Sequence, residues 1–175
     1  MRIKQGNYQK ALKIFKAYLE KSYNEGHYIE VIILLYHSIN ASMNITFNTV
    51  AEGLRFIMNG TDKGSESLKN EYYGIKEYDF RPLAHMLFEM GIYSKDLHDD
   101  LIKLQDFRNE IMHRFFTSKL NKSKFDKYYG LGIKLLDQTS KISLEISKTF
   151  VDSIKRLRSE PNYLADLLGQ VRQEE

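Results

Sequence analysis

HYIEVIILLYHSINASMNITF, residues 27–47, is the stretch of sequence that decides the fold. Its first half places apolar side chains on nearly every side of a helical wheel, at Ile29, Val31, Ile32, Ile33, Leu34, Leu35 and Ile39. A helix that is apolar all round is buried by other elements. Glu30, His37 and Asn40 interrupt the run, which favours a core helix over a membrane span. We therefore predict a central helix that begins near His27 and runs past Phe47 toward Met58.

Helical periodicity recurs on both sides of this central tract. Residues 7–23, 94–116 and 123–158 repeat apolar side chains at spacings of three and four, as helices with one apolar face do. Residues 59–78 lose that periodicity and gather glycine, serine, asparagine and charge, which is typical of a loop. Ser159 and Pro161 are expected to open a short C-terminal helix. The sequence thus predicts an all-α protein, an antiparallel helical bundle of about five helices.

Local signals mark where several of these helices begin and end. Asp79 is predicted to cap a short helix over 81–90 that Gly91 ends, and Ser94 to cap the helix over 94–116. Gly130 and Gly132 are expected to be weak points within the last long helix.

Composition excludes several classes of protein. The 175 residues, 42% of them hydrophobic, suffice for one core, so we expect a single domain over residues 1–175. No cysteine is present, which excludes disulfide scaffolds and thiolate metal sites.

Lysines interrupt the first twenty residues, so we expect no signal peptide, no membrane partner and a cytoplasmic location. The net charge of +3 is too small to attract nucleic acid by field alone, so any RNA contact must be local.

Arg108 is the residue that departs most from the helical pattern. The helix over 94–116 has an apolar stripe made of Leu97, Leu101, Leu104, Ile111 and Phe115. Arg108 falls near the middle of that stripe at about 100° per residue. Burying an unpaired guanidinium costs several kcal/mol. Arg108 is therefore tied to a buried carboxylate, extends past its neighbours to bring its charge to solvent, or opens to a functional pocket.

His113 and Asn109 accompany Arg108 on the same helix. His113 is rotated from Arg108 by about 140° and displaced by roughly 7.5 Å along the axis, so the two side chains diverge. Asn109 lies one turn before His113, a spacing that allows an amide to orient an imidazole. The other histidines, His27, His37, His85 and His98, are interpreted as structural.

Residues 108–113 read RNEIMH, which resembles the R-x(4-6)-H motif of HEPN domains in the form with asparagine after the arginine. The motif lies late in a long helix that another long helix follows, as in that family. The bundle as a whole resembles the family over about residues 7–158, and the six motif positions carry the specific likeness. The resemblance implies a homodimeric, metal-independent endoribonuclease in which two copies of the motif meet at the dimer axis.

The resemblance also implies a role for each residue of the motif. Arg108 would bind the scissile phosphate of RNA, His113 would act as general acid or base, and Asn109 would orient its neighbours. No metal and no cofactor are expected. Attack by the ribose 2′-OH would leave a 2′,3′-cyclic phosphate and a 5′-OH end. The biological role implied is that of a toxin, a defence nuclease or an RNA-processing enzyme.

Two other functions remain open at this stage. A non-catalytic HEPN dimer could serve as an adaptor or as a nucleotide-binding module. Glu110 and His113 also spell Glu-x-x-His, a ligand pair of ferritin-like metal-binding bundles, although the chain holds no second such pair. A nucleotidyltransferase-type antitoxin is a candidate partner. Some toxins of that class carry tyrosine two residues after the motif histidine, where this chain has Phe115, so modification of that tyrosine does not carry over.

Overall fold

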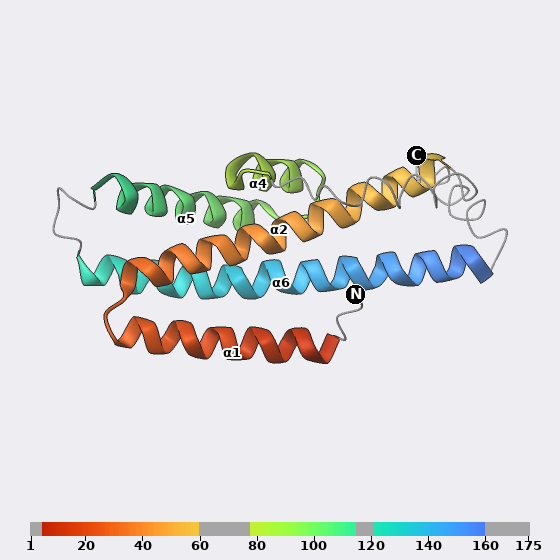
Figure 1. Cartoon of the computed structure of the whole chain (residues 1–175). Coiled ribbons are helices and arrows are strands. Elements are labelled where there is room, and N and C mark those ends of the chain that lie inside the picture. Colours follow the sequence, from red (N-terminus) through yellow and green to blue (C-terminus); the bar gives the residue numbers. More distant parts are fainter. Residues whose placement is uncertain (1–4, 60–77, 115–120, 160–175) are drawn as a thin grey trace.

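The computed structural model describes residues 5–59, 78–114 and 121–159, and these residues form five helices and no strand (Figure 1). The helices are α1 (Gln5–Asn24), α2 (Tyr28–Asn59), α4 (Phe80–Glu89), α5 (Lys95–Arg114) and α6 (Lys122–Ser159). The predicted all-α bundle is confirmed, and each predicted helix in the described ranges matches an observed one. The short C-terminal helix expected after Ser159, and nearly all of the loop expected over 59–78, lie outside the described residues.

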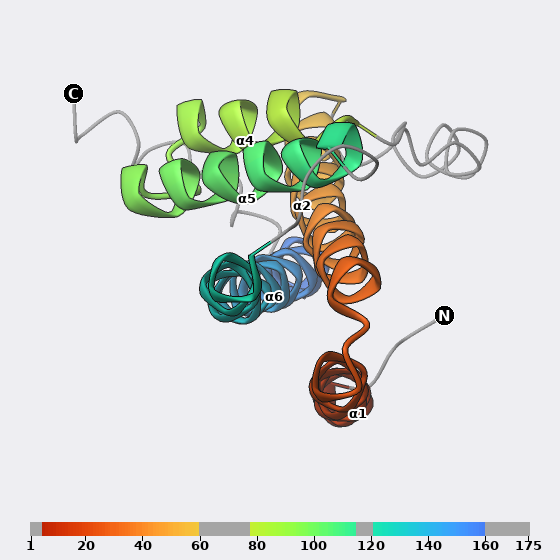
Figure 2. The same cartoon turned by 90° about the vertical axis from the view of Figure 1, so that its left-hand side faces the viewer.

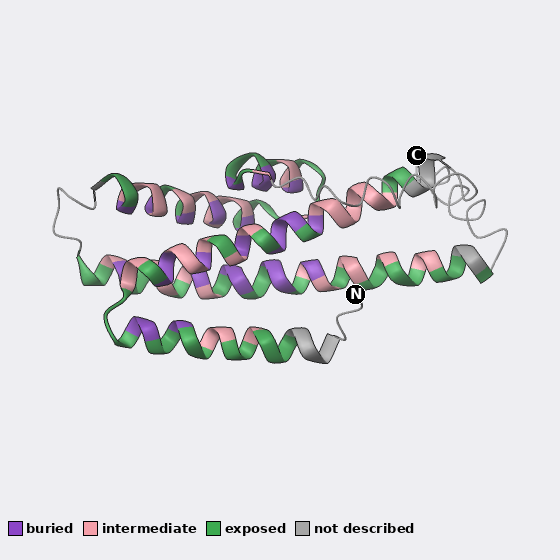
Figure 3. Ribbon diagram, viewed as in Figure 1, coloured by how far each residue is buried: buried purple, intermediate pink, exposed green. Residues whose placement is uncertain are grey.

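α2 is the central helix of the bundle. It contacts all four of the other helices. Val31, Ile32, Leu35 and Ile39 are fully buried along it, as the all-round apolar pattern predicts. Figure 3 shows buried residues along α2 and α6, on α4 and α5, and on part of α1. Within the described ranges, neither α2 nor any other helix has the length and apolar content needed to cross a membrane.

The helices are arranged around the pair formed by α2 and α6. Figures 1 and 2 show α4 and α5 together on one side of this pair and α1 on the other. α1 and α6 are antiparallel, because Tyr23 donates a hydrogen bond to Asp126 while Lys16 pairs with Asp137. α5 and α6 are also antiparallel, since Lys134 pairs with Asp100 and Lys124 with Glu110.

The expectation of an antiparallel bundle is wrong for the most extensively packed pair, α2 and α6, which run parallel. The hydroxyls of Ser42 and Ser140 lie 3.4 Å apart, and further along both helices Gly53 faces Phe150. The physical reason is the chain path. α5 returns the chain to the end of the bundle where α2 begins, so α6 starts there too and runs in the same direction as α2.

The two glycines of α6 have different surroundings. A Cβ atom built on Gly132 would lie 2.8 Å from Cδ1 of Leu35, whereas one built on Gly130 would meet nothing within 4 Å. Both glycines lie within α6, which continues through them. Gly132 therefore allows α6 to approach α2 closely, a role that its interpretation as a weak point of the helix did not include.

We expect Gly130→Ala and Gly132→Ala to affect stability differently. Alanine is favoured over glycine in a helix by about 1 kcal/mol, so Gly130→Ala should raise the free energy of unfolding. In Gly132→Ala the new methyl group must displace the fully buried Leu35, and overpacking of that kind costs about 1 to 3 kcal/mol. Urea denaturation should rank Gly130→Ala above Gly132→Ala by about that amount. Equal stabilities would contradict the prediction, because they would mean that the end of the Leu35 side chain moves aside at little cost.

The helix ends agree in part with the local signals. The hydroxyl of Ser94 accepts a hydrogen bond from the backbone N–H of Leu97 at 3.3 Å, which confirms it as a cap. Gly91 has a φ of 70° just after α4, as expected for a glycine that ends a helix. Asp79 occupies the N-cap position of α4, but its side chain makes no capping hydrogen bond. The prediction for Asp79 is therefore right in position and wrong in mechanism.

Candidate functional site

Successive residues of α5 face different neighbours at the centre of its apolar stripe. Phe107 is 1% exposed and stacks on Tyr128 of α6, with ring centroids 3.9 Å apart. Arg108 is half-buried and lies toward α2 instead. The expectation that Arg108 occupies the middle of the stripe is thus corrected, because Phe107 holds the fully buried position and Arg108 lies at its edge.

The guanidinium of Arg108 is held between an aromatic ring and an amide. Its central carbon lies 5.1 Å from the ring centroid of Tyr36, a cation–π distance. Its NH1 group donates a hydrogen bond to Oδ1 of Asn109 at 3.1 Å. Tyr36 in turn stacks on Phe80 of α4, with centroids 4.3 Å apart. These contacts restrict the rotamers of the arginine without neutralising its charge.

Arg108 has no carboxylate partner among the described residues. Its Nε atom is buried and has no hydrogen-bond partner there. A buried hydrogen-bond donor without a partner lowers the free energy of unfolding. Such groups are rare in folded proteins, and each one calls for an explanation such as a functional role. The arrangement therefore argues against a tie to a buried carboxylate among the described residues, and it fits both a guanidinium that reaches past its neighbours to solvent and one that receives an anion.

Tyr36 is a site residue that sequence reasoning missed. Burial raises the pKa of Tyr36, while the nearby Arg108 lowers it and Asp79 raises it further, with a net upward shift. The phenol beneath the guanidinium is therefore neutral at physiological pH. Tyr36 belongs to the apolar run of α2, where a tyrosine is indistinguishable from a core aromatic by periodicity alone.

His113 lies in the last turn of α5 and is exposed. Its neighbour Met112 is 48% exposed, a large value for an apolar side chain. No described side chain hydrogen-bonds to His113, and Asn109 binds Arg108 instead. One chain alone therefore places Arg108 and His113 in different surroundings, as their divergence on the helical wheel predicts.

The described residues offer no support for a ferritin-like site at Glu110. Glu110 accepts a hydrogen bond from Nζ of Lys124 at 2.5 Å, across the gap between α5 and α6. Within the described ranges, no group of three or more histidine, cysteine or acidic residues is placed to hold a metal ion. The side chain of Arg114 and the whole of Phe115 lie outside the described residues.

Comparisons of the chain with protein-family models, with curated proteins and with solved structures found no match. The function must therefore be argued from the side chains of α5 and their surroundings.

Proposed function

We propose that this chain is a metal-independent endoribonuclease of the HEPN type, which acts as a homodimer with Arg108 and His113 of both protomers at one composite site. The observation that carries the proposal is the state of Arg108. Its guanidinium is half-buried, positioned by Tyr36 and Asn109, and lacks a carboxylate partner among the described residues. Such a group is prepared to receive an anion, and a phosphodiester is the anion whose geometry a guanidinium fork matches.

The chemistry requires groups that bind the phosphate and groups that move protons. Arg108 would hold a non-bridging phosphate oxygen and stabilise the charge that develops there during reaction. One His113 would take the proton from the ribose 2′-OH as that oxygen attacks phosphorus. The other His113 would protonate the departing 5′ oxygen as the P–O5′ bond breaks. The products would be a 2′,3′-cyclic phosphate and a 5′-OH end, with every proton accounted for.

A second copy of the chain is needed because the motif residues diverge. About 140° of rotation separates Arg108 from His113 on α5, so one helix does not direct both at the same phosphate. A two-fold axis near the end of α5 would bring the imidazole of one protomer to the guanidinium of the other. The exposed side chain of Met112, next to His113, supplies apolar surface for such an interface.

We expect a dimer in solution that depends on Met112. Light scattering should report twice the chain mass of 20.6 kDa at micromolar concentration. Met112→Glu should shift the protein toward the monomer, because a buried, unpaired carboxylate disfavours an apolar interface. Met90→Glu is the matched control, since Met90 is 40% exposed at the end of α4 and far along the chain from the motif. A wild-type monomer would contradict the composite site.

The proposed activity is tested by incubating purified protein with mixed RNA in the presence of EDTA. Cleavage that leaves cyclic phosphate ends, without added metal, would support the nuclease assignment. A dimer that binds nucleotides or RNA but produces no new ends would instead support the non-catalytic HEPN alternative. Cleavage abolished by EDTA and restored by metal would exclude the proposed mechanism.

A further inference from the structure

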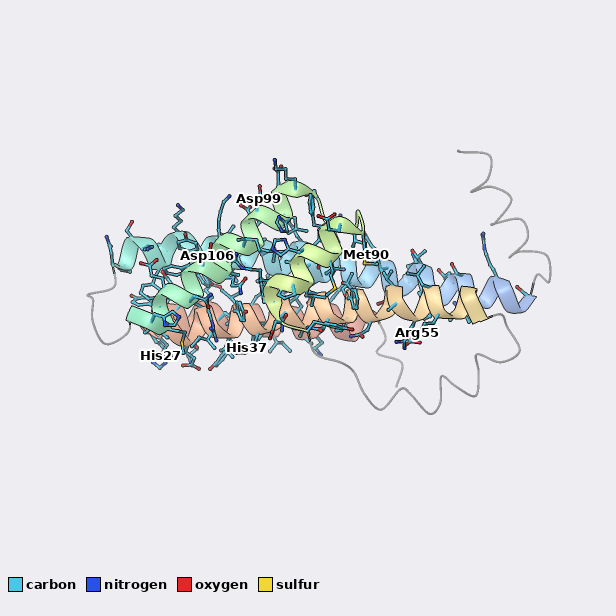
Figure 4. All side chains as sticks on the ribbon, turned by 90° about the horizontal axis from the view of Figure 1, so that it is seen from above. His27, His37, Arg55, Met90, Asp99 and Asp106 are labelled. Atoms are coloured by element: carbon cyan, nitrogen blue, oxygen red, sulfur yellow. The ribbon has the colours of Figure 1, made fainter. Side chains whose placement is uncertain are left out.

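A chain of hydrogen bonds joins three side chains at the contact between α4 and α5. Nδ1 of His98 lies 3.1 Å from Oδ1 of Asp99, and Nε2 of the same ring lies 2.9 Å from Nδ1 of His85. The side chain of His98 is only 13% exposed, while that of Asp99 is 47% exposed. His85, on α4, is exposed. Figure 4 labels Asp99 on α5, in the part of that helix that lies beside α4.

The ring of His98 is held in place from several directions. The ring of Phe88 lies against it, with centroids 4.9 Å apart, and Asp99 fixes its Nδ1 side. Because Asp99 is an acceptor when ionised, Nδ1 of His98 carries the proton. When the His98 ring is neutral, its Nε2 then presents a lone pair that accepts the proton on Nδ1 of His85. In that neutral state the one carboxylate assigns the tautomers of both rings.

We propose that His85 and His98 form a binding site for a divalent transition-metal ion such as Zn²⁺ or Cu²⁺. A carboxylate that orients a histidine through Nδ1 while Nε2 faces a metal is a recurrent arrangement around metal ligands. Here Asp99 and His98 already have that arrangement, and His85 presents a second nitrogen to the same point. Imidazole nitrogens suit both ions, and water would fill the remaining coordination positions, so with two protein ligands the site would bind an exchangeable ion and not a permanent structural one.

To bind a metal ion the two rings would have to move apart and tilt, because both lone pairs must point at the ion and not along the line that joins the two nitrogens. Two nitrogens bound tetrahedrally to zinc lie about 3.3 Å apart, so the present separation of 2.9 Å would open by about 0.4 Å. The exposed His85 ring is free to make that movement. The metal would replace the proton shared by the two rings, and His85 would carry its own proton on Nε2 instead of Nδ1. No net proton is released when both rings start neutral.

The site is separate from the proposed nuclease centre. His98 lies ten residues before Arg108 on α5, which corresponds to about 15 Å along the helix. A metal here would connect α4, a helix of ten residues, to α5 and stabilise that contact. It therefore has no part in the proposed cleavage step, which should persist when the metal is removed.

The test is calorimetric titration of the full chain with Zn²⁺ at a pH where the imidazoles are neutral. We expect one ion per chain, and a melting temperature that rises by several degrees with the metal. His85→Gln should weaken binding by at least tenfold and abolish that rise, and because its side chain is exposed the fold should survive. Asp99→Asn should weaken binding by about tenfold to hundredfold while both ligands remain.

Two controls separate this site from ordinary surface histidines. His27 lies 3.3 Å from Glu30 and is the matched histidine–carboxylate pair elsewhere on the surface, so His27→Gln should leave binding unchanged. The Cu²⁺ form should show two nitrogen ligands in its electron paramagnetic resonance spectrum. Unchanged Zn²⁺ binding in His85→Gln, loss of binding in His27→Gln, or a spectrum with a single nitrogen would overturn the proposal.

Discussion

Replacing His113 by alanine is expected to lower RNA cleavage by about two to four orders of magnitude, the usual contribution of a general acid or base. The side chain is exposed at the end of α5 and makes no hydrogen bond to a described residue, so its removal should leave the melting temperature close to that of the wild type. Initial rates on a labelled RNA, measured beside thermal unfolding, test both parts. His85→Ala is the matched control, because His85 is also exposed but lies on α4.

Mixing experiments make this prediction sharper. If one His113 acts as base and the other as acid, a dimer with a single wild-type histidine should be nearly inactive. When wild-type and His113→Ala chains exchange subunits, cleavage should then fall with the square of the wild-type fraction. A linear fall would mean that one His113 is enough for each cleavage event. Undiminished cleavage by His113→Ala would remove this histidine from the mechanism altogether.

Alanine at two neighbouring positions of α5 should affect different properties: Phe107→Ala should reduce stability, and Arg108→Ala should reduce cleavage. Phe107→Ala should lower the free energy of unfolding by about 3 to 5 kcal/mol, because it removes a buried ring from its stack with Tyr128. Arg108→Ala should change stability by only about 1 kcal/mol, since it loses a cation–π contact and one hydrogen bond but also removes the unpaired Nε. Cleavage should nevertheless be lost in Arg108→Ala.

Chemical denaturation and cleavage assays on the same preparations distinguish the two roles of Arg108. Arg108→Lys is the control, because it keeps a positive charge over Tyr36 but lacks the fork that grips a phosphate. It should fold like the wild type and cleave poorly. A loss of 3 to 5 kcal/mol in Arg108→Ala would instead indicate a structural arginine whose removal leaves a partner charge unpaired. That outcome would contradict the assignment of Arg108 to phosphate binding.

The sequence allowed prediction of those residues of the candidate site that lie close together on one helix. Arg108, Asn109 and His113 stand within one turn and a half of helix, so their spacing alone indicated that the arginine and the histidine diverge. Tyr36 could not be found in this way, because it joins the site from another helix about seventy residues earlier in the chain. The same holds for His85 and His98, which no sequence pattern connects and which the contact of α4 with α5 brings together.

The sequence by itself determined which segments are helical and which of them is central. These features depend on local signals: apolar periodicity, the capping hydroxyl of Ser94 and the glycine at position 91. Each signal involves residues only a few positions apart, so it does not depend on how the helices pack against one another. Only the tertiary structure decided that α2 and α6 run parallel, that Gly132 allows their close approach and that Phe107 displaces Arg108 from the core. These outcomes depend on the rotation and direction of whole helices, which are set by how side chains from distant parts of the chain fill the same space.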